Sequence, residues 1–346
     1  MDVRLSPEQQ ALRDSSARLV DRLGPHAVGD LGDPERTAKL DAAVTGAGWR
    51  ELRTAADGDE PLASGVEVAI VAEALGRGLA DVSFLGPTLA SELRRLAGAP
   101  PSAETETVVL DPPLMSVARV AGSRTPDGVA VDVQGSSRAL LLIEGAGGSR
   151  LAHVVVDPAP VGADLTRPSA ALDPTAAVTA LAGAARPITD EALVRWTALG
   201  LSVACADLVG SMEGAVRLAT GYAIERHQYG AAIGSFQAVQ HLLADAYVLT
   251  EGSRSVTRHA SWAVDELPAA DALAAAAVAK AYCARAARQV CETAIQVHGG
   301  IGNTWECLAH VYLRRSLLSG DLFGDAESCV TRVLHHRSIG DGHGLR

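Results

Sequence analysis

From about Thr189 onward, the chain contains three long helical patterns with few residues that would break them. They span residues 191–226, 237–267 and 269–298, and the shorter stretch "TWECLAHVYLRRSLL" follows. Their apolar positions are mostly alanine, leucine and valine, and small side chains let helices pack closely. Long helices joined by short turns run antiparallel, so the sequence predicts a C-terminal four-helix bundle over residues 188–346.

Two further regions precede this bundle. Residues 1–103 are helical in pattern and begin with Ser6 as an N-cap, Pro7 at the first helical position and Gln9 as the capping-box partner. Residues 104–187 contain short β-rich runs, "TVVL", "VAVDV", "ALLLI" and "AHVVV", separated by Gly, Pro, Asp and Ser. We expect a small antiparallel β-domain here, and therefore an α+β architecture in three parts.

Composition limits the functional classes. The net charge is -11 and the basic residues are dispersed, which argues against a nucleic-acid partner because such binding needs clustered Lys and Arg. The N-terminal segment is polar and no uninterrupted apolar run reaches membrane-spanning length, so we expect a cytoplasmic protein without a membrane partner. No histidine or cysteine constellation suggests a metal. The cysteines lack close pairs and read as buried thiols, at Cys205, Cys283, Cys291, Cys307 and Cys329.

Two glycine-containing motifs interrupt the long helices. In "ERHQYGAAIGSFQ", Arg226 and Gln228 stand at the end of the first long helix, Gly230 is expected to stop it, and Phe236-Gln237 opens the next. In "IQVHGGIGNTWE", the third long helix stops at Gly299 and Gly300. The intervening antiparallel helices should bring both motifs to one end of the bundle.

This constellation suits a diphosphate joined to a base. Arginine supplies paired donors for a phosphate, the glutamine Gln296 offers an amide, and glycine lets a ligand approach backbone N–H groups. A simpler interpretation makes both glycine sites helix caps and pairs Arg226 with a carboxylate.

Taken together, the two motifs resemble the C-terminal domain of the acyl-CoA dehydrogenases, from about residue 191 to 325. The resemblance implies FAD as cofactor, an acyl-CoA substrate, α,β-desaturation (an oxidoreductase acting on CH–CH bonds), and an acceptor such as electron-transfer flavoprotein. In that family these residues hold the adenine and pyrophosphate end of an FAD bound chiefly by a neighbouring subunit. Carried over, they are Arg226, Gln228, Tyr229, Phe236, Gln237, Gln296, Gly299 and Gly300.

The family's catalytic base has no counterpart here. The reaction needs a carboxylate to take the proton α to the thioester. Counting from the glycine pair, as in one group of members, leads to Phe323; counting back from the arginine motif, as in another group, leads to Gly200. Asp321 is the fallback acid, with Asp325 on the other side of Phe323. Glu306 is read as a capping-box residue, with Asn303 as N-cap.

The middle region departs as well. Where the family carries Thr-Glu-Pro followed by Gly-Ser-Asp and a tryptophan strand, this chain has "VVLDPPLM" and no Phe, Tyr or Trp between Phe84 and Trp196. Retention of the adenine end with loss of the reactive end resembles the subunit without a base in heterotetrameric (α2β2) enzymes of actinobacterial steroid side-chain degradation. A homologous partner subunit would then supply the base.

Three alternatives remain open from the residues. The chain could be a self-sufficient homo-oligomeric dehydrogenase with Asp321 as base. It could be a flavin-dependent oxygenase on the same fold, because such enzymes dispense with the glutamate. It could also be a flavin-free binding protein.

Overall fold

The computed structural model describes residues 4–56, 58–121, 125–145, 147–157 and 162–339. The N-terminal part is helical, with α1 (Pro7–Leu23), α2 (Pro34–Gly46), α3 (Gly65–Arg77) and α4 (Leu85–Leu96), and two short 3-10 turns, η1 (Val28–Asp30) and η2 (Trp49–Glu51). Helix α1 begins as the sequence predicts, because Ser6 accepts from the backbone N–H of Gln9 and the Gln9 side chain accepts in return.

The middle of the chain forms one sheet in the order β6-β3-β1-β4-β5-β7, with β2 beside β4. Its strands within the described residues are β1 (Glu106–Leu110), β2 (Arg119–Val120), β3 (Val129–Val131), β4 (Arg138–Ile143), β5 (Arg150–Val155), β6 (Ala170–Ala171) and β7 (Thr179–Ala180). The expectation of a purely antiparallel sheet is wrong, because β1 and β2 both pair with β4 in parallel. The reason is that β4 returns between β1 and β5 instead of pairing with β3, its predecessor.

Both faces of this sheet are covered. Along β4, Leu140 and Leu142 join the main core shared with the helices, while Ala139 and Leu141 join a second, smaller core. The alternation follows from the two-residue period of a strand. Buried ion pairs also join this part to the bundle: Arg167, ahead of β6, contacts Asp207 at 3.2 Å.

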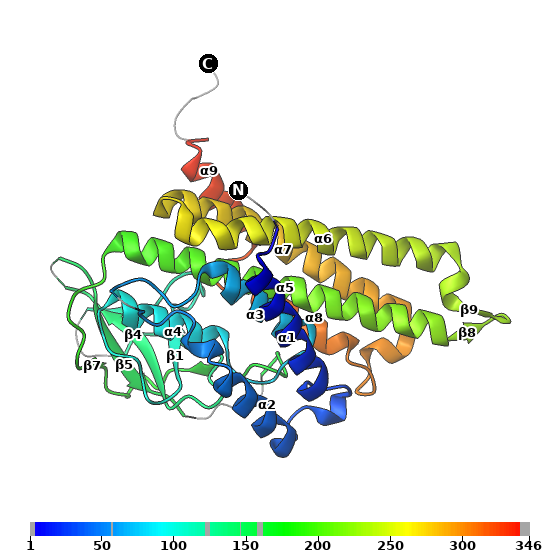
Figure 1. Ribbon diagram of the computed structural model, residues 1–346, viewed down its shortest axis with the longest axis horizontal. Helices are drawn as coiled ribbons and strands as arrows, with labels where there is room; N and C mark the ends of the chain where they lie inside the picture. Colours follow the sequence, from blue (N-terminus) through cyan, green and yellow to red (C-terminus); the bar gives the residue numbers. More distant parts are fainter. Residues whose placement is uncertain (1–3, 57, 122–124, 146, 158–161, 340–346) are drawn as a thin grey trace.

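The C-terminal part consists of α5 (Asp190–Glu225), α6 (Gln237–Glu266), α7 (Ala269–His298), the 3-10 turn η4 (Gly299–Asn303), α8 (Ala309–Asp321) and α9 (Ala326–His336). Figure 1 shows the long helices lying side by side, with the small hairpin β8 (His227–Gln228) and β9 (Ala231–Ala232) projecting from one end. Helix α5 is long and apolar enough to cross a membrane, but 78% of its most apolar window is buried inside the fold. It therefore serves as the central helix of the core.

Candidate functional site

The hairpin at the end of α5 is held by an unusual turn. Helix α5 ends at Glu225 with Arg226 as its cap, and β8 and β9 pair across Tyr229 and Gly230, both of which have positive φ, 53° and 81°. Two such residues in a row make the turn type that joins twisted strands. Gly230 was expected to stop the helix, and that expectation is wrong: the helix ends five residues earlier, at Glu225, and Gly230 completes the hairpin turn.

The side chains at this hairpin are displayed to solvent. Arg226 and Gln228 are exposed, and within the described residues no hydrogen bond or ion pair engages either side chain. Tyr229 is 96% exposed, and its ring meets that of Phe236 edge to face, at 6.5 Å between centroids. Gln237, the first residue of α6, is exposed as well. The simpler interpretation, in which Arg226 pairs with a carboxylate of its own chain, finds no support among the described residues.

The end of α7 lies next to the end of α5. The rings of Tyr222 and His298 stack at 4.5 Å between centroids, so the two helix ends are neighbours. Gly299 caps α7 with φ 65°, a conformation that favours glycine. Gly300 has no positive φ, and a Cβ on it would meet nothing within 4 Å. The backbone conformation therefore explains the glycine at 299. At 300 neither the backbone conformation nor the space available requires a glycine, and the backbone there is open to solvent.

The two alternative base positions meet in space. Phe323 is fully buried, and a Cβ built on Gly200 would lie 2.6 Å from its ring. The ring also meets Trp196 edge to face at 5.6 Å, and the Trp196 indole N–H donates to the carbonyl of Leu89 at 3.0 Å. An aromatic ring thus fills the volume that a carboxylate on either residue would occupy. Sequence counting found both positions but gave no sign of their contact.

Two cations hold the segment that carries Phe323. The ammonium of Lys280, whose pKa is lowered by burial, donates to the carbonyls of Leu322 and Gly324. The guanidinium of Arg332 donates to the carbonyl of Phe323 and, at 3.2 Å, to that of Met115. These bonds hold Phe323 at φ 63°, a conformation uncommon for a bulky residue. Sequence reasoning missed Lys280, although a lysine in the alanine-rich α7 was a signal.

The acids beside Phe323 do not share its position. Asp321 is exposed at the last residue of α8, and partial burial raises its pKa while Lys280 opposes that shift. Asp325 caps α9 by accepting from the N–H of Ser328 at 2.8 Å. Phe323, in contrast, is buried between them.

Glu306 is not a capping-box residue. Helix α8 begins at Ala309 with Leu308 as its N-cap, so Asn303 caps nothing and instead ends η4. The pattern suggested a helix starting at 304, but Thr304 closes a turn by donating to the carbonyl of Ile301. Glu306 is exposed on the surface.

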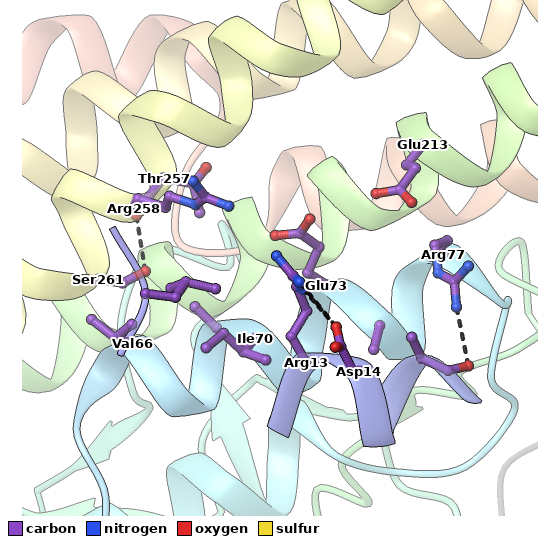
Figure 2. Close-up of a pocket in the computed structure, with 14 residues that line it drawn as sticks. Arg13, Asp14, Val66, Ile70, Glu73, Arg77, Glu213, Thr257, Arg258 and Ser261 are labelled. Carbon is purple, nitrogen blue, oxygen red and sulfur yellow. Dashed lines mark hydrogen bonds and ion pairs between the residues drawn. The ribbon is translucent and has the colours of Figure 1, made fainter. Parts of the chain in front are cut away.

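A cavity of about 180 Å³ lies between α1, α3, α5 and α6 (Figure 2). Its charges are largely matched within the chain: Arg254 donates to Glu73 at 2.8 Å and to Glu213 at 2.5 Å, and Arg13 pairs with Asp14. It contains none of the eight residues expected to bind a cofactor. The same is true of the other four prominent cavities of the described chain. Those eight residues form an exposed surface, not a pocket.

Comparison with known proteins finds similar sequences in one protein family. The profile of the acyl-CoA dehydrogenase C-terminal domain matches residues 201–336. The acyl-CoA dehydrogenase IpdE2 of Mycobacterium tuberculosis is 31% identical over 344 residues, which cover 94% of this chain and 96% of that protein. FadE34 of the same organism is 37% identical, over only 39% of this chain and 19% of its own length.

Solved structures agree on the fold. A chain of "Tcur3481-Tcur3483 steroid ACAD G363A variant" superimposes with a TM-score of 0.77 at 21% identity, covering 96% of this chain and 98% of that one. A chain of the ChsE4-ChsE5 complex from Mycobacterium tuberculosis gives 0.77 at 23% identity, covering 99% and 100%. With the near full-length match to IpdE2, these findings show that the chain belongs to the acyl-CoA dehydrogenase family.

Proposed function

We propose that this chain is the subunit without a base in an FAD-dependent acyl-CoA dehydrogenase. It contributes one wall of an FAD site through Arg226, Gln228, Tyr229, Phe236, Gln237, Gln296, Gly299 and Gly300. A homologous partner subunit supplies the remaining wall and the carboxylate that takes the proton α to the thioester. The flavin supplies the acceptor for the hydride from the β carbon.

The observation that carries this proposal is the separation of two points on α5. Gly200 marks the position of the base and Arg226 the position of the diphosphate contact, 26 residues apart on one continuous helix. At 1.5 Å per residue the separation is about 39 Å along the axis. An extended FAD molecule is shorter than that. A cofactor held at the hairpin therefore serves a reacting centre on another chain.

The residues at the hairpin fit a cofactor's diphosphate and base. Arg226 offers an exposed guanidinium that no described residue pairs with, Gln228 and Gln296 offer amides, and Gly300 leaves its backbone N–H open to approach. Because the surface is exposed, a second wall is needed to exclude water, as cofactor sites are normally concave. The partner's hydrogen-bonding surface would provide that wall.

The names of the similar structures support the type of assembly and substrate. One is the Tcur3481-Tcur3483 steroid ACAD, whose name joins two proteins, and the other is the ChsE4-ChsE5 complex. We extend both features to this chain: an α2β2 assembly that acts on the acyl-CoA thioester of a lipid or steroid side chain and passes electrons to an acceptor such as electron-transfer flavoprotein.

The test is to purify this chain alone and in co-expression with a homologous family member, and to measure bound flavin and acyl-CoA oxidation. We expect a colourless, inactive chain alone, and one FAD per pair of unlike chains in an active complex. One FAD per chain in an active preparation of the chain alone would contradict the proposal and favour a self-sufficient enzyme with Asp321 as base. Absence of FAD from the complex would favour a flavin-free binding protein.

A further inference from the structure

Helix α7 carries a stripe of residues along its outer side. Positions three or four residues apart fall on one side of a helix, and this side of α7 runs through Asp271, Ala274, Val278, Tyr282 and Arg285. Val278 is 47% exposed and Tyr282 is 40% exposed, so the centre of the stripe presents large apolar side chains to solvent. We call these five residues the α7 stripe.

The two ends of the α7 stripe carry opposite charges. The carboxylate of Asp271 is 51% exposed and lies 3.2 Å from the ring nitrogen of His336. The guanidinium of Arg285 is exposed, and no hydrogen bond or ion pair joins it to another described residue. Both residues lie seven positions from Val278, one on each side. The stripe is therefore negative at one end, apolar in the middle and positive at the other end.

A glycine on α6 shapes the surface beside the stripe. A Cβ built on Gly252 would lie 2.6 Å from the hydroxyl oxygen of Tyr282, so the tyrosine side chain lies against the backbone of α6. Figure 1 shows α6 and α7 side by side along the bundle. Because Tyr282 lies over the neighbouring helix, the stripe leaves room for another helix to approach α7.

The α7 stripe is complementary to its own reverse. In a contact with two-fold symmetry, the same surface of both copies meets, and residues equally far from the axis on opposite sides face each other. With the axis at Val278, Asp271 of each copy faces Arg285 of the other. The small Ala274 of each copy faces the large Tyr282 of the other, and Val278 meets its own counterpart. An unlike partner requires no such match of a stripe with its reverse.

From this match of charge and size we infer that a second copy of this chain docks on the α7 stripe, antiparallel and centred on Val278. Helix α7 begins at Ala269, which would face Ala287 of the other copy, so the two α7 helices overlap no further than that. Gln296 lies nine residues beyond Ala287, about 14 Å along the helix axis. The two hairpin surfaces therefore stay free, at opposite ends of the pair.

The contact does not depend on the proposed cofactor role. In the proposed α2β2 assembly it joins the two copies of this chain, and each copy can still meet an unlike subunit at its hairpin. It can also form in the chain alone, so its test and the test of the proposed function have separate outcomes.

Cross-linking at the two-fold axis tests the inference, because only there does a residue meet its own counterpart. Val278→Cys adds an exposed thiol to a chain whose native cysteines are buried. After oxidation of the purified full chain with diamide, we expect most of this variant to run as a covalent dimer on a non-reducing gel. Gln289→Cys, exposed on the same helix beyond the overlap, should stay mostly monomeric. No dimer from Val278→Cys, or equal cross-linking of both variants, would overturn the inference.

Charge reversal tests the pairing of the two ends. Asp271→Arg and Arg285→Asp each replace two attractive contacts with two repulsive ones, so each should weaken self-association at least tenfold in sedimentation equilibrium. The double variant exchanges the charges and should associate within threefold of the parent chain. Asp271→Arg and the double variant both lose the contact with His336, so recovery in the double variant reports the contact between copies. A double variant as weak as the single ones would overturn the inference.

The same cross-link in the complex of unlike subunits separates this inference from the proposed function. We expect a dimer of two copies of this chain in a flavin-containing complex that carries Val278→Cys. A flavin-containing complex without that dimer would overturn the inference and leave the proposed function standing. The dimer in a complex without flavin would support the inference and contradict the proposed function.

Discussion

Two regions along α5 differ in whether their side chains find contacts within the chain. Around Gly200 the packing is tight: the Phe323 ring fills the space beside it, Trp196 packs against that ring, and Lys280 and Arg332 donate to carbonyls of the segment that carries Phe323. Around Arg226 the polar side chains are exposed and have no partner within the described chain. The first region is packed and hydrogen-bonded by residues of this chain. The polar groups of the second region can find partners only on another molecule. Substitutions should therefore lower stability in the first region and weaken binding in the second.

The largest effect is expected from Phe323→Ala. Removing a fully buried aromatic ring should lower the free energy of unfolding by about 3–5 kcal/mol, from lost burial and from the cavity it leaves. Urea denaturation measures it. Phe236→Ala is the matched control, because Phe236 is 38% exposed and should cost less than about 1 kcal/mol. Equal effects would mean that the region around Gly200 is not tightly packed.

A smaller effect is expected from Gly200→Ala. The added methyl group would lie 2.6 Å from the Phe323 ring, and overpacking of this kind costs about 1–3 kcal/mol. The cost should vanish in the Phe323→Ala background, because the atoms in conflict are gone. A double-mutant cycle by urea denaturation checks this coupling. Additive effects would show that the two residues are not in contact.

The sequence predicted the long helices well because their periodicity is local. Each end of α6 and α7 lies within a residue of the prediction. It could not predict the parallel pairing of β1 with β4 or the contact of Phe323 with Gly200, since both join distant positions. At the hairpin it took Gly230 for a helix stop because Tyr229 at positive φ is rare for a bulky residue. The prediction that Glu306 belongs to a capping box was wrong because the same residue pattern also occurs in turns.

In the second region, Arg226→Ala should weaken FAD retention by the complex of unlike subunits about tenfold, roughly 1.4 kcal/mol, through loss of a charge-assisted contact to phosphate. Fluorescence of released flavin during dialysis measures it. The free energy of unfolding of the chain should stay within about 0.5 kcal/mol, because the side chain is exposed and no described residue bonds to it. Arg288→Ala, on the exposed face of α7 and paired with Glu292, is the control and should retain FAD as the parent does. Unchanged retention in Arg226→Ala would remove its role at the diphosphate.

The smallest effect, and the one that best separates the two kinds of region, is expected from Gly300→Ala. A Cβ there meets nothing within 4 Å and the backbone has no positive φ, so the fold itself should tolerate alanine. A cofactor that approaches the N–H of residue 300 closely would clash with the added methyl group. We therefore expect a threefold to fivefold loss of FAD retention, roughly 1 kcal/mol or less. Gly46→Ala, equally open but at the end of α2, should leave FAD retention unchanged and should not lower stability, because alanine is favoured over glycine in a helix. If Gly300→Ala retained FAD fully, the open backbone at the end of α7 would belong to a loop and not to a binding surface.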